Sequence, residues 1–557
     1  LFIYSLASIP PLKQVLFSRT HLSLSLKNLT HKLSILMEAS RASCVALSVV
    51  LVSIVITWVW RVLNWVWLRP NKLERCLREQ GLTGNSYRLL FGDTKEISMM
   101  VEQAQSKPIK LSTSHDIAPR VIPFSHQIVN TYGRNSFVWM GPTPRVTIMN
   151  PEDLKDAFNK SVEFQRAISN PIVKSISQGL SSLAGEKWAK HRKIINPAFH
   201  LEKLKGMLPT FYQSCSEMIN KWESLVFKEG SCELDVWPYL ENLTSDVISR
   251  AAFGSSYEEG RKIFQLLREE AKFYTIAARS VYIPGWRFLP TKQNKRMKEI
   301  HKDVRGLLKG IINKREDAIK AGEAAKGDLL GVLMESNFRE IQEHGNNKNA
   351  GMSIEDVIGE CKLFYFAGQE TTSVLLVWTL VLLSQNQDWE ARAREEVLQV
   401  FGTNIPTYDQ LSHLKVVTMI LLEVLRLYPA VVELPRTTNK KTQLGKFSLP
   451  AGVEVSLHIM LAHHDKELWG EDAKEFKPER FSEGVSKATK NQFTYFPFGA
   501  GPRTCIGQNF AMLEAKLALS LILQHFTFEL SPSYAHAPSV TITLHPQFGA
   551  HFILHKR

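Results

Sequence analysis

The strongest candidate for chemistry in this sequence is a ten-residue segment near its C-terminal end, residues 498–507, which reads FGAGPRTCIG. Its three glycines and its proline exclude an ordinary helix or strand. An apolar run without glycine or proline follows over 508–523 and predicts a helix. Cys505 therefore lies in a tight loop just before a helix N-terminus, where free backbone N–H groups and the helix dipole lower the pKa of a thiol. A thiolate held in this way is a nucleophile or a metal ligand.

The other five cysteines do not decide between these two roles. They are scattered at positions 44, 76, 215, 232 and 361 and form no C-x-x-C pair. This spacing indicates neither a zinc site nor a disulfide framework, and it favours a reducing compartment. The chain also has 17 histidines, so a catalytic Cys–His dyad stays open.

A second informative stretch is a long helix predicted over 354–384, which is apolar nearly all round and which we expect to be buried. Its middle nevertheless reads AGQETT over 367–372. Gly368 weakens the helix by about 1 kcal/mol relative to alanine, and the polar groups of Glu370 and Thr371 are costly there unless they find partners. Two interpretations follow: a solvated kink in a core helix, or a groove opened so that a ligand and waters can approach.

Three further motifs accompany these two segments. Glu423 and Arg426 are three residues apart on a predicted helix, so they share one face as an ion pair. Arg480 lies in the sequence FKPERF, and the sequence WAKHR places Trp188 and Arg192 one helical turn apart. Each of these is weak alone, because such pairs are common on protein surfaces.

Together these motifs resemble those of the cytochrome P450 family of haem-thiolate monooxygenases. The pattern F-x-x-G-x-R-x-C-x-G over 498–507 matches the haem-binding signature of that family at every fixed position. The pattern A-G-x-E-T-T over 367–372 matches its oxygen-activation motif, and Glu423, Arg426 and the Arg480 segment match its structural triad. The motifs follow the order and spacing of the family, and the resemblance covers the chain from about residue 70 to the end.

The resemblance implies a role for each of these residues. Cys505 becomes the axial ligand, and hence the metal ligand, of a haem b iron, and its thiolate favours O–O cleavage. Glu370 and Thr371 are the implied catalytic residues, which hold water and relay protons toward the reacting oxygen. Four further residues match positions that bind the haem propionates in the family: Trp188, Arg192, Arg436 and Arg503. The remaining implied cofactor-binding residues are Phe498 and Gly499.

Within the family, residues 188–200 and 510–556 resemble the plant secologanin synthase-like group. Members of that group oxidise terpenoids, namely oleanane-type triterpenes, iridoids and in some cases gibberellins. The sequence has no convincing flavin or nicotinamide fingerprint, so the resemblance implies that dioxygen is reduced with electrons from NADPH–cytochrome P450 reductase. The expected substrate is a small apolar terpenoid, first of the oleanane type. Two other functions stay open: an isomerase or dehydratase that needs no oxygen, and a haem-binding sensor.

By analogy with the family, four segments line the substrate pocket. They are the loop 168–180, the helix segment 364–371, residues 431–434 and the turn near Val540. Most of them are apolar, as a terpenoid skeleton requires. Glu433 is the exception, and it either forms a salt bridge or accepts a hydrogen bond from a substrate hydroxyl.

The N-terminal part predicts a membrane anchor. Residues 1–36 contain no Asp or Glu and read as an organelle transit peptide or as an extension upstream of a start at Met37. Residues 37–68 follow with an uncharged run, a cluster of tryptophans and basic residues on the C-terminal side. The positive-inside rule then places the catalytic domain, 69–557, in the cytosol, on a single-pass anchor that contacts lipid. The resemblance implies that the membrane is that of the endoplasmic reticulum. A cleaved signal peptide is the alternative.

The charge balance excludes one class of partner. The 557 residues carry a net charge of +14, yet no lysine or arginine block is long enough for a nucleic-acid-binding arm. We therefore predict no nucleic-acid partner and expect the basic surface to face a membrane or an acidic protein such as the reductase.

The expected fold is mainly α with a minor β region, the cytochrome P450 fold preceded by one transmembrane helix. A small sheet surrounded by helices is predicted over 81–150, a mobile surface loop over 339–351, and short strands after Pro429. A helix is also predicted to open at Pro151, with acids in its first turn. The longer helices are predicted at 187–195, 201–228, 239–253, 258–279, 293–321, 354–384, 388–401 and 415–427.

Overall fold

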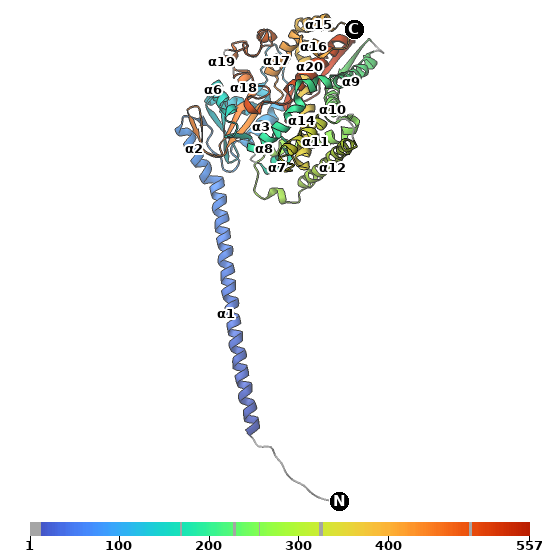
Figure 1. The fold of residues 1–557 in the computed structure, drawn as a ribbon. Coiled ribbons are helices and arrows are strands. Elements are labelled where there is room, and N and C mark those ends of the chain that lie inside the picture. The colour runs from blue at the N-terminus through green and yellow to red at the C-terminus, as the bar shows by residue number, and fades with distance from the viewer. Residues whose placement is uncertain (1–12, 167–169, 227–229, 256, 322–326, 490–492) are drawn as a thin grey trace, which may run out of the picture. The chain divides into compact units, whose positions relative to one another are not determined.

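The computed structural model describes residues 13–166, 170–226, 230–255, 257–321, 327–489 and 493–557. The chain divides into two compact units, Leu1–Arg69 and Pro70–Arg557 (Figure 1). The N-terminal unit contains one long helix, α1 (Lys13–Leu63), which ends in a π-helical turn, η1 (Asn64–Leu68).

The N-terminal helical region exposes its apolar side chains. Between Lys27 and Glu79 it is long and apolar enough to cross a membrane, and none of its most apolar window is buried in protein. Val50 is 54% exposed and Trp58 is 64% exposed. Such exposure is expected where hydrocarbon covers the side chains. The anchor predicted over 37–68 falls within this region.

The second unit is mainly helical, and each longer helix that the sequence predicts agrees with an observed helix to within two residues at either end. The helices are α2 (Arg69–Glu79), α3 (Thr94–Gln105), α4 (Ala118–Val121), α5 (Pro123–Tyr132), α6 (Pro151–Asn159), α7 (Pro171–Ile176), α8 (Gly185–Ile195), α9 (Leu201–Val226), α10 (Trp237–Phe253), α11 (Tyr257–Ala278), α12 (Lys292–Lys320), α13 (Leu329–Glu343), α14 (Ile354–Gln385), α15 (Gln387–Phe401), α16 (Tyr408–Ser412), α17 (Lys415–Leu427), α18 (Ile459–His463), α19 (Lys466–Trp469) and α20 (Gln508–His525).

The predicted loop 339–351 is wrong over its first five residues, because α13 continues to Glu343. This helix is capped by Asp328, whose carboxylate accepts the Gly331 N–H at 2.8 Å. Its first turns bury leucines, but its second half is polar, and that half reads as a loop in the sequence pattern. The helix stops before Gly345, which adopts a left-handed φ of 66°.

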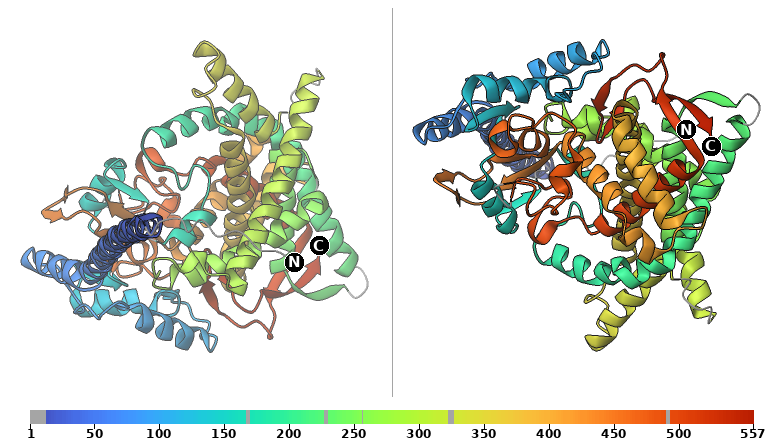
Figure 2. Two further views of the ribbon diagram at one scale, coloured as in Figure 1. Left: turned by 90° about the horizontal axis from the view of Figure 1, so that it is seen from below. Right: turned by 90° about the horizontal axis from the view of Figure 1, so that it is seen from above.

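α14 is the central helix of the second unit, packed among α10, α11 and α20 (Figures 1 and 2). It begins with a capping box in which Ser353 and Asp356 exchange hydrogen bonds. Most of its length is buried, as predicted. At Gly368 the helix stays continuous, and a Cβ there would lie 2.6 Å from Cγ1 of Ile248 on α10. This glycine therefore allows close helix packing, a role that neither interpretation of the sequence includes.

Within the described residues, the strands form one larger sheet and three small ones. The larger sheet has six strands in the order β1-β2-β3-β9-β6-β4, in which β1 with β2 and β3 with β9 are parallel pairs and the others are antiparallel. A second apolar cluster covers this sheet, separate from the main helical core. The strands are β1 (Thr83–Gly84), β2 (Ser136–Met140), β3 (Thr143–Ile148), β4 (Phe164–Arg166), β5 (Ser231–Asp235), β6 (Glu433–Thr438), β7 (Thr442–Leu444), β8 (Phe447–Leu449), β9 (Glu454–His458), β10 (Phe526–Leu530), β11 (Pro538–Val540), β12 (Leu544–Pro546) and β13 (His551–Lys556).

Candidate functional site

The loop that carries Cys505 spans residues 498–507 and is here called the Cys505 loop. The Cys505 N–H donates to the Phe498 carbonyl oxygen at 2.9 Å, which closes the loop just before α20. Gly499 and Gly501 adopt left-handed φ values of 69° and 65°, which glycine accepts without strain. A Cβ at Gly501 would also lie 2.8 Å from a backbone carbonyl oxygen of α6. The two glycines therefore fix the path that presents the thiol.

The prediction of a lowered thiol pKa is wrong for Cys505. Burial raises the pKa of this thiol, and it outweighs the lowering by the Gly507 N–H and by the positive charge of Arg192. The side chain is nevertheless exposed by surface area. Both observations hold for a thiol that faces an internal space lined by protein. A thiolate there needs a compensating cation, which favours the metal-ligand interpretation over a free nucleophile.

Cationic side chains gather beside the Cys505 loop. Arg192, on α8, donates to the Thr504 carbonyl oxygen at 2.8 Å. Arg503 donates to the Leu183 carbonyl oxygen at 2.8 Å, and its guanidinium carbon lies 4.7 Å from the ring centre of Trp188. The structure thus brings Trp188, Arg192 and Arg503 together around Cys505, as the sequence predicts.

Arg436 joins this group from the sheet, together with an arginine that the sequence analysis misses. Arg166 on β4 and Arg436 on β6 are directly opposite each other in the antiparallel pair. Burial, followed by the charges of Arg166 and Arg503, lowers the pKa of Arg436 to about 10. Like charges directly across a ladder are destabilising unless an anion compensates them.

The hydrogen-bond partners of these arginines are uncharged: they are backbone carbonyl groups and, for Arg166, also the Ser181 hydroxyl. Arg166 donates to Ser181, Arg192 to Thr504, Arg436 to Pro435 and Arg503 to Leu183. In the described part of the chain, no carboxylate forms an ion pair with any of the four. Nε of Arg503 is buried and has no hydrogen-bond partner there. The arrangement is therefore suited to a ligand with more than one negative charge.

Glu370 and Thr371, both on α14, are half-buried, and both side chains have hydrogen-bond partners. Thr371 donates its hydroxyl to the Ala367 carbonyl oxygen at 2.9 Å. Glu370 accepts the Thr543 hydroxyl at 3.0 Å, from the turn after β11. Among the described residues, no hydrogen bond or ion pair joins Glu370 or Thr371 to Cys505; their two helices, α14 and α20, are packed together.

Two further acids lie near this pair, and both have raised pKa values. Glu241, on α10, has a pKa of about 7, mainly through burial, with a smaller contribution from the charge of Glu370 and an opposing one from Arg268. Glu514, on α20, is fully buried, and neither carboxylate oxygen has a hydrogen-bond partner among the described residues. Burial raises its pKa well above the usual value, and the nearby Thr372 hydroxyl opposes this in part. Proton-carrying groups therefore lie on both sides of this segment of α14.

Glu433 is held by protein partners. Its carboxylate accepts Arg145 at 3.2 Å and the Ser456 hydroxyl at 2.6 Å, and it lies 3.4 Å from Nε2 of His458. Arg145 also pairs with Glu454. The salt-bridge alternative is therefore correct, and the expectation that Glu433 receives a substrate hydroxyl is not retained.

The remaining expected pocket segments are only partly described. Residues 168 and 169, at the start of the predicted loop 168–180, lie outside the described residues. Its other end, Gly179, contacts α14 at Gly359. The turn after Val540 reaches α14 through Thr543.

Glu423 and Arg426 form the buried pair that the sequence predicts. Both side chains are completely buried, and two hydrogen bonds of 2.7 Å join them. Arg426 also donates to backbone carbonyl oxygens, including that of His463 at 2.8 Å. Arg480 joins this network through an ion pair of 3.6 Å between its Nε and Glu423, and its guanidinium also pairs with Asp472 at 2.8 Å. The network fixes α17 to the segments that follow it.

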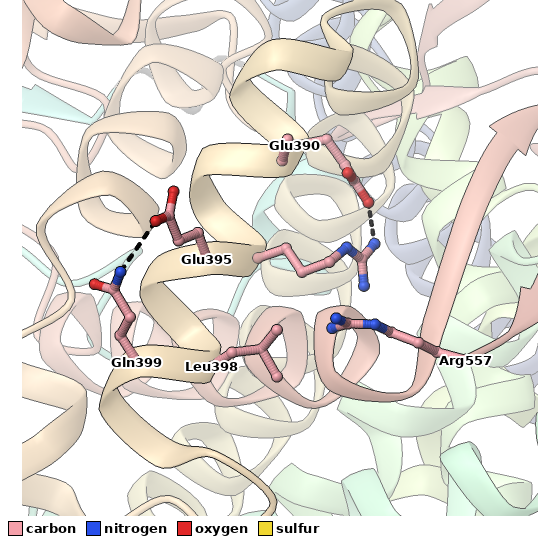
Figure 3. A pocket seen from close by; sticks show the side chains of 7 residues that line it. Glu390, Glu395, Leu398, Gln399 and Arg557 are labelled. Atoms are coloured by element: carbon pink, nitrogen blue, oxygen red, sulfur yellow. Dashed lines mark hydrogen bonds and ion pairs between the residues drawn. The ribbon is translucent and has the colours of Figure 1, made fainter.

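An open surface pocket lies elsewhere, on α15 beside the C-terminal residue (Figure 3). Glu390 and Arg394 form an ion pair there, Glu395 and Gln399 are hydrogen-bonded, and Arg557 faces them. None of the residues that the motifs identify lines this pocket, so it plays no part in the candidate site.

Comparisons with known proteins agree with this geometry. A family model described as "Cytochrome P450" matches residues 119–547. Cytochrome P450 CYP72A219 of Panax ginseng is 62% identical over 503 residues, covering 90% of this chain and 96% of that protein. The 7-deoxyloganic acid hydroxylase of Catharanthus roseus is 56% identical over 511 residues, covering 91% of this chain and 98% of that protein.

A solved structure supports the fold. The cyanobacterial CYP120A1 with bound retinoic acid superposes with a TM-score of 0.70 at 24% sequence identity, covering 86% of this chain and 99% of that one. With the family match and the relatives above, these findings define the class of protein. The chain belongs to the cytochrome P450 family, whose members are haem-thiolate monooxygenases that receive electrons from a reductase and consume dioxygen.

Proposed function

We propose that this chain binds haem b through Cys505 and oxidises a small apolar terpenoid, with an oleanane-type triterpene as the first candidate. The observation that carries the haem site is the arginine group beside Cys505. Arg166, Arg436 and Arg503 share one region without a carboxylate partner among the described residues. Haem has two propionates, and this charge matches the cluster.

The other cofactor contacts follow from the same loop. Phe498 and Gly499 would lie against the porphyrin, since the left-handed turn at Gly499 leaves the backbone uncovered by a side chain. Trp188 would support Arg503 through its ring, and Arg192 would hold the loop at Thr504. A haem with a thiolate ligand supplies oxygen activation, because the thiolate donates electron density that favours O–O cleavage.

Glu370 and Thr371 are proposed as the catalytic residues for proton transfer. The hydroxyl proton of Thr371 is directed at the Ala367 carbonyl oxygen, which leaves the hydroxyl oxygen to accept from a water. The bond from Thr543 orients the carboxylate of Glu370. Glu370 can then exchange a proton with water and pass it along the helix to a water held by Thr371.

A second candidate substrate is an iridoid acid. It is favoured by the 7-deoxyloganic acid hydroxylase of Catharanthus roseus, which has 56% identity over nearly the whole chain. Gibberellin oxidation is a third possibility that the resemblance to the secologanin synthase-like group raises.

The test is turnover in microsomes that contain NADPH–cytochrome P450 reductase, with β-amyrin-type triterpenes, 7-deoxyloganic acid and a gibberellin as substrates. We expect NADPH consumption coupled to one oxidised product from the triterpene set. Coupled turnover of 7-deoxyloganic acid alone would select the iridoid candidate. A chain that binds haem but consumes no NADPH above the Cys505→Ser control with any substrate would contradict the monooxygenase proposal and favour a sensor.

The proposed location is the endoplasmic reticulum membrane, with the catalytic domain in the cytosol and lipid around the α1 anchor. Asn159 and Asn242 lie in N-x-S/T sequons and are exposed, so a lumenal domain would be open to glycosylation. We expect no mobility shift on deglycosylation and complete digestion of the domain by protease added to sealed microsomes. A glycosylated, protected domain would reverse the topology.

A further inference from the structure

A buried histidine, His463 at the end of α18, connects the Cys505 loop to the interior of the protein. His463 is 0% exposed, and its Nε2 atom accepts the Phe496 N–H at 3.1 Å. Phe496 lies two positions before the loop, and its own carbonyl oxygen accepts the Gly499 N–H at 2.9 Å. The imidazole ring therefore holds the turn with which the Cys505 loop begins.

The backbone of the same histidine is attached to the buried pair on α17. The His463 carbonyl oxygen accepts Arg426 at 2.8 Å, and two hydrogen bonds of 2.7 Å join Arg426 to Glu423. A continuous series of contacts thus runs from this pair, through the backbone and the ring of His463, to the turn before Gly499. His463 itself lies outside every motif that the sequence analysis identifies.

Aromatic side chains fix the orientation of the His463 ring. The ring stacks on Tyr495, with ring centres 5.3 Å apart and an angle of 17° between the planes. Trp469 and Phe496 lie edge-on to it, with ring centres at 6.2 and 5.3 Å. The Tyr495 hydroxyl donates to the Leu422 carbonyl oxygen of α17 at 2.8 Å, so the stacked ring is held in place as well. This enclosure leaves little room for rotation, and Nε2 stays directed at the Phe496 N–H.

The hydrogen bond from Phe496 defines the protonation state of His463. A backbone N–H can only donate, so Nε2 carries no proton, and the neutral ring carries its proton on Nδ1. Burial lowers the pKa of His463 well below its usual value, and the positive charge of Arg426 acts in the same direction. Nδ1 is buried without a hydrogen-bond partner among the described residues. A buried donor without a partner is costly, and such departures from local rules occur chiefly at functional sites.

We propose that His463 is a positioning residue for the Cys505 thiolate: by accepting the Phe496 N–H it fixes the turn that begins the loop, and thereby the position of the sulfur. The path from this turn to the sulfur is short, because the Cys505 N–H bonds to the carbonyl oxygen of Phe498, which lies within the turn. A shift of the turn therefore moves the backbone of Cys505. The inference rests on the proposed function for the thiolate ligand, whereas the attachment of the loop to His463 does not.

The experiment compares two replacements of His463 in the full-length chain with haem in membranes. In His463→Gln the side-chain amide oxygen can reach the place of Nε2 and accept the Phe496 N–H. In His463→Phe an aromatic ring remains beside Tyr495, but it offers no acceptor. His464→Phe is the matched control, because His464 is also buried and also loses one hydrogen bond, that to the Leu427 carbonyl oxygen at 2.8 Å.

Hydrogen exchange of single amides supplies the first readout. We expect exchange of the Phe496 and Gly499 amides to accelerate about tenfold or more in His463→Phe, because the turn loses the hydrogen bond that holds it. In His463→Gln and His464→Phe the same amides should change by less than about threefold. Unchanged exchange in His463→Phe would overturn the inference that the ring holds the loop.

The spectrum of the reduced carbon monoxide complex supplies the second readout. We expect the thiolate-type fraction in His463→Phe to fall at least about twofold, since the partners of a metal ligand control its orientation. His463→Gln should restore this fraction, and His464→Phe should retain it. A full thiolate-type fraction in His463→Phe despite faster exchange would overturn the positioning role. An equal loss in His464→Phe would overturn it too, because general destabilisation would then explain the result.

His463→Asn keeps the test decisive if His463→Phe fails to fold. The shorter amide reaches the place of Nδ1 but not that of Nε2, so the Phe496 N–H again loses its acceptor, while the site stays polar. The same exchange and spectral results are expected, and the same negative results would overturn the inference. If Cys505→Ser retains the thiolate-type spectrum, the proposed ligand fails, whereas exchange at Phe496 still decides whether His463 holds the loop.

Discussion

Replacement of Glu423 by glutamine tests the buried pair on α17 without creating a cavity. Glu423 and Arg426 are both 0% exposed and share two hydrogen bonds of 2.7 Å. Breaking a buried ion pair by neutralising one partner costs about 3–5 kcal/mol. The Lys477 N–H donates to the same carboxylate at 2.9 Å. The amide oxygen of the introduced glutamine can still accept this hydrogen bond. We therefore expect Glu423→Gln to lower the free energy of unfolding by about 4 kcal/mol.

That loss is large against the 5–15 kcal/mol that stabilises a typical native protein. At about 2 °C per kcal/mol for a large domain, it lowers the temperature of half-inactivation by roughly 8 °C. The assay is the loss of the thiolate-type spectrum of the reduced carbon monoxide complex during heating in microsomes. Glu335→Gln is the matched control, because Glu335 is 56% exposed and forms a surface pair with Arg339, worth at most about 1 kcal/mol.

A midpoint for Glu423→Gln within about 2 °C of the unmodified protein, or about 1 kcal/mol, would refute this reasoning. It would mean that the carbonyl partners of Arg426, at His463, Ala473 and Glu475, suffice to compensate its charge.

Three further predictions concern the site and the pH dependence. Cys505→Ser should abolish the thiolate-type spectrum of the reduced carbon monoxide complex, and a retained spectrum would remove Cys505 as the ligand. Thr543→Val should release Glu370 and lower the fraction of NADPH that yields product by about threefold or more, as for a disturbed general acid–base group; unchanged coupling would contradict the orienting role. Burial lowers the pKa of His115 to about 4 and those of His464 and His536 to about 3. Unfolded histidines titrate near 6.5, so the stabilising contribution is complete above that pH and is lost as the pH falls toward 4, by up to about 1.4 kcal/mol per unit for each histidine. Denaturation midpoints between pH 4 and 7 should show this decline, and His464→Gln should make it shallower; a flat profile would count against buried neutral rings.

The helical part of the fold could be predicted because its signals are local. The N-cap residue Asn150 accepts the Glu152 N–H directly before the helix that Pro151 opens, and Ser353 with Asp356 marks the start of α14. The failure at α13 has the same origin, since a helix with a polar second half resembles a loop when only its composition is considered. Strand pairing is different, because β4 pairs with β6 across some 270 residues, and no local pattern specifies such a partner.

The residues of the candidate site also fall into two groups: those that a local sequence motif identifies and those that only the folded chain brings to the site. Cys505, Arg503, Trp188 and Arg192 lie in recognisable motifs, and the structure gathers them. Arg166 and Thr543 could not be identified in this way, because each acts on a residue far away in the sequence and neither lies in a motif. The predicted direction of the Cys505 pKa failed for a physical reason: the loop and helix terminus were considered, but the cost of burial, which dominates, was not.

The arginine pair across β4 and β6 shows what the structure adds to the motifs. A sheet gains nothing from two guanidinium groups in register. Burial of Arg436, followed by the charges of Arg166 and Arg503, lowers its pKa to about 10, so its charge is costly at this position. Natural sequences depart from local rules chiefly at functional sites. The unfavourable pair is therefore a reason to expect a bound dianion that does not depend on the Cys505 motif. Arg166→Leu should weaken haem retention even though no motif contains Arg166, and haem content measured after gel filtration tests this. Unchanged haem retention would show that the pair is compensated in another way.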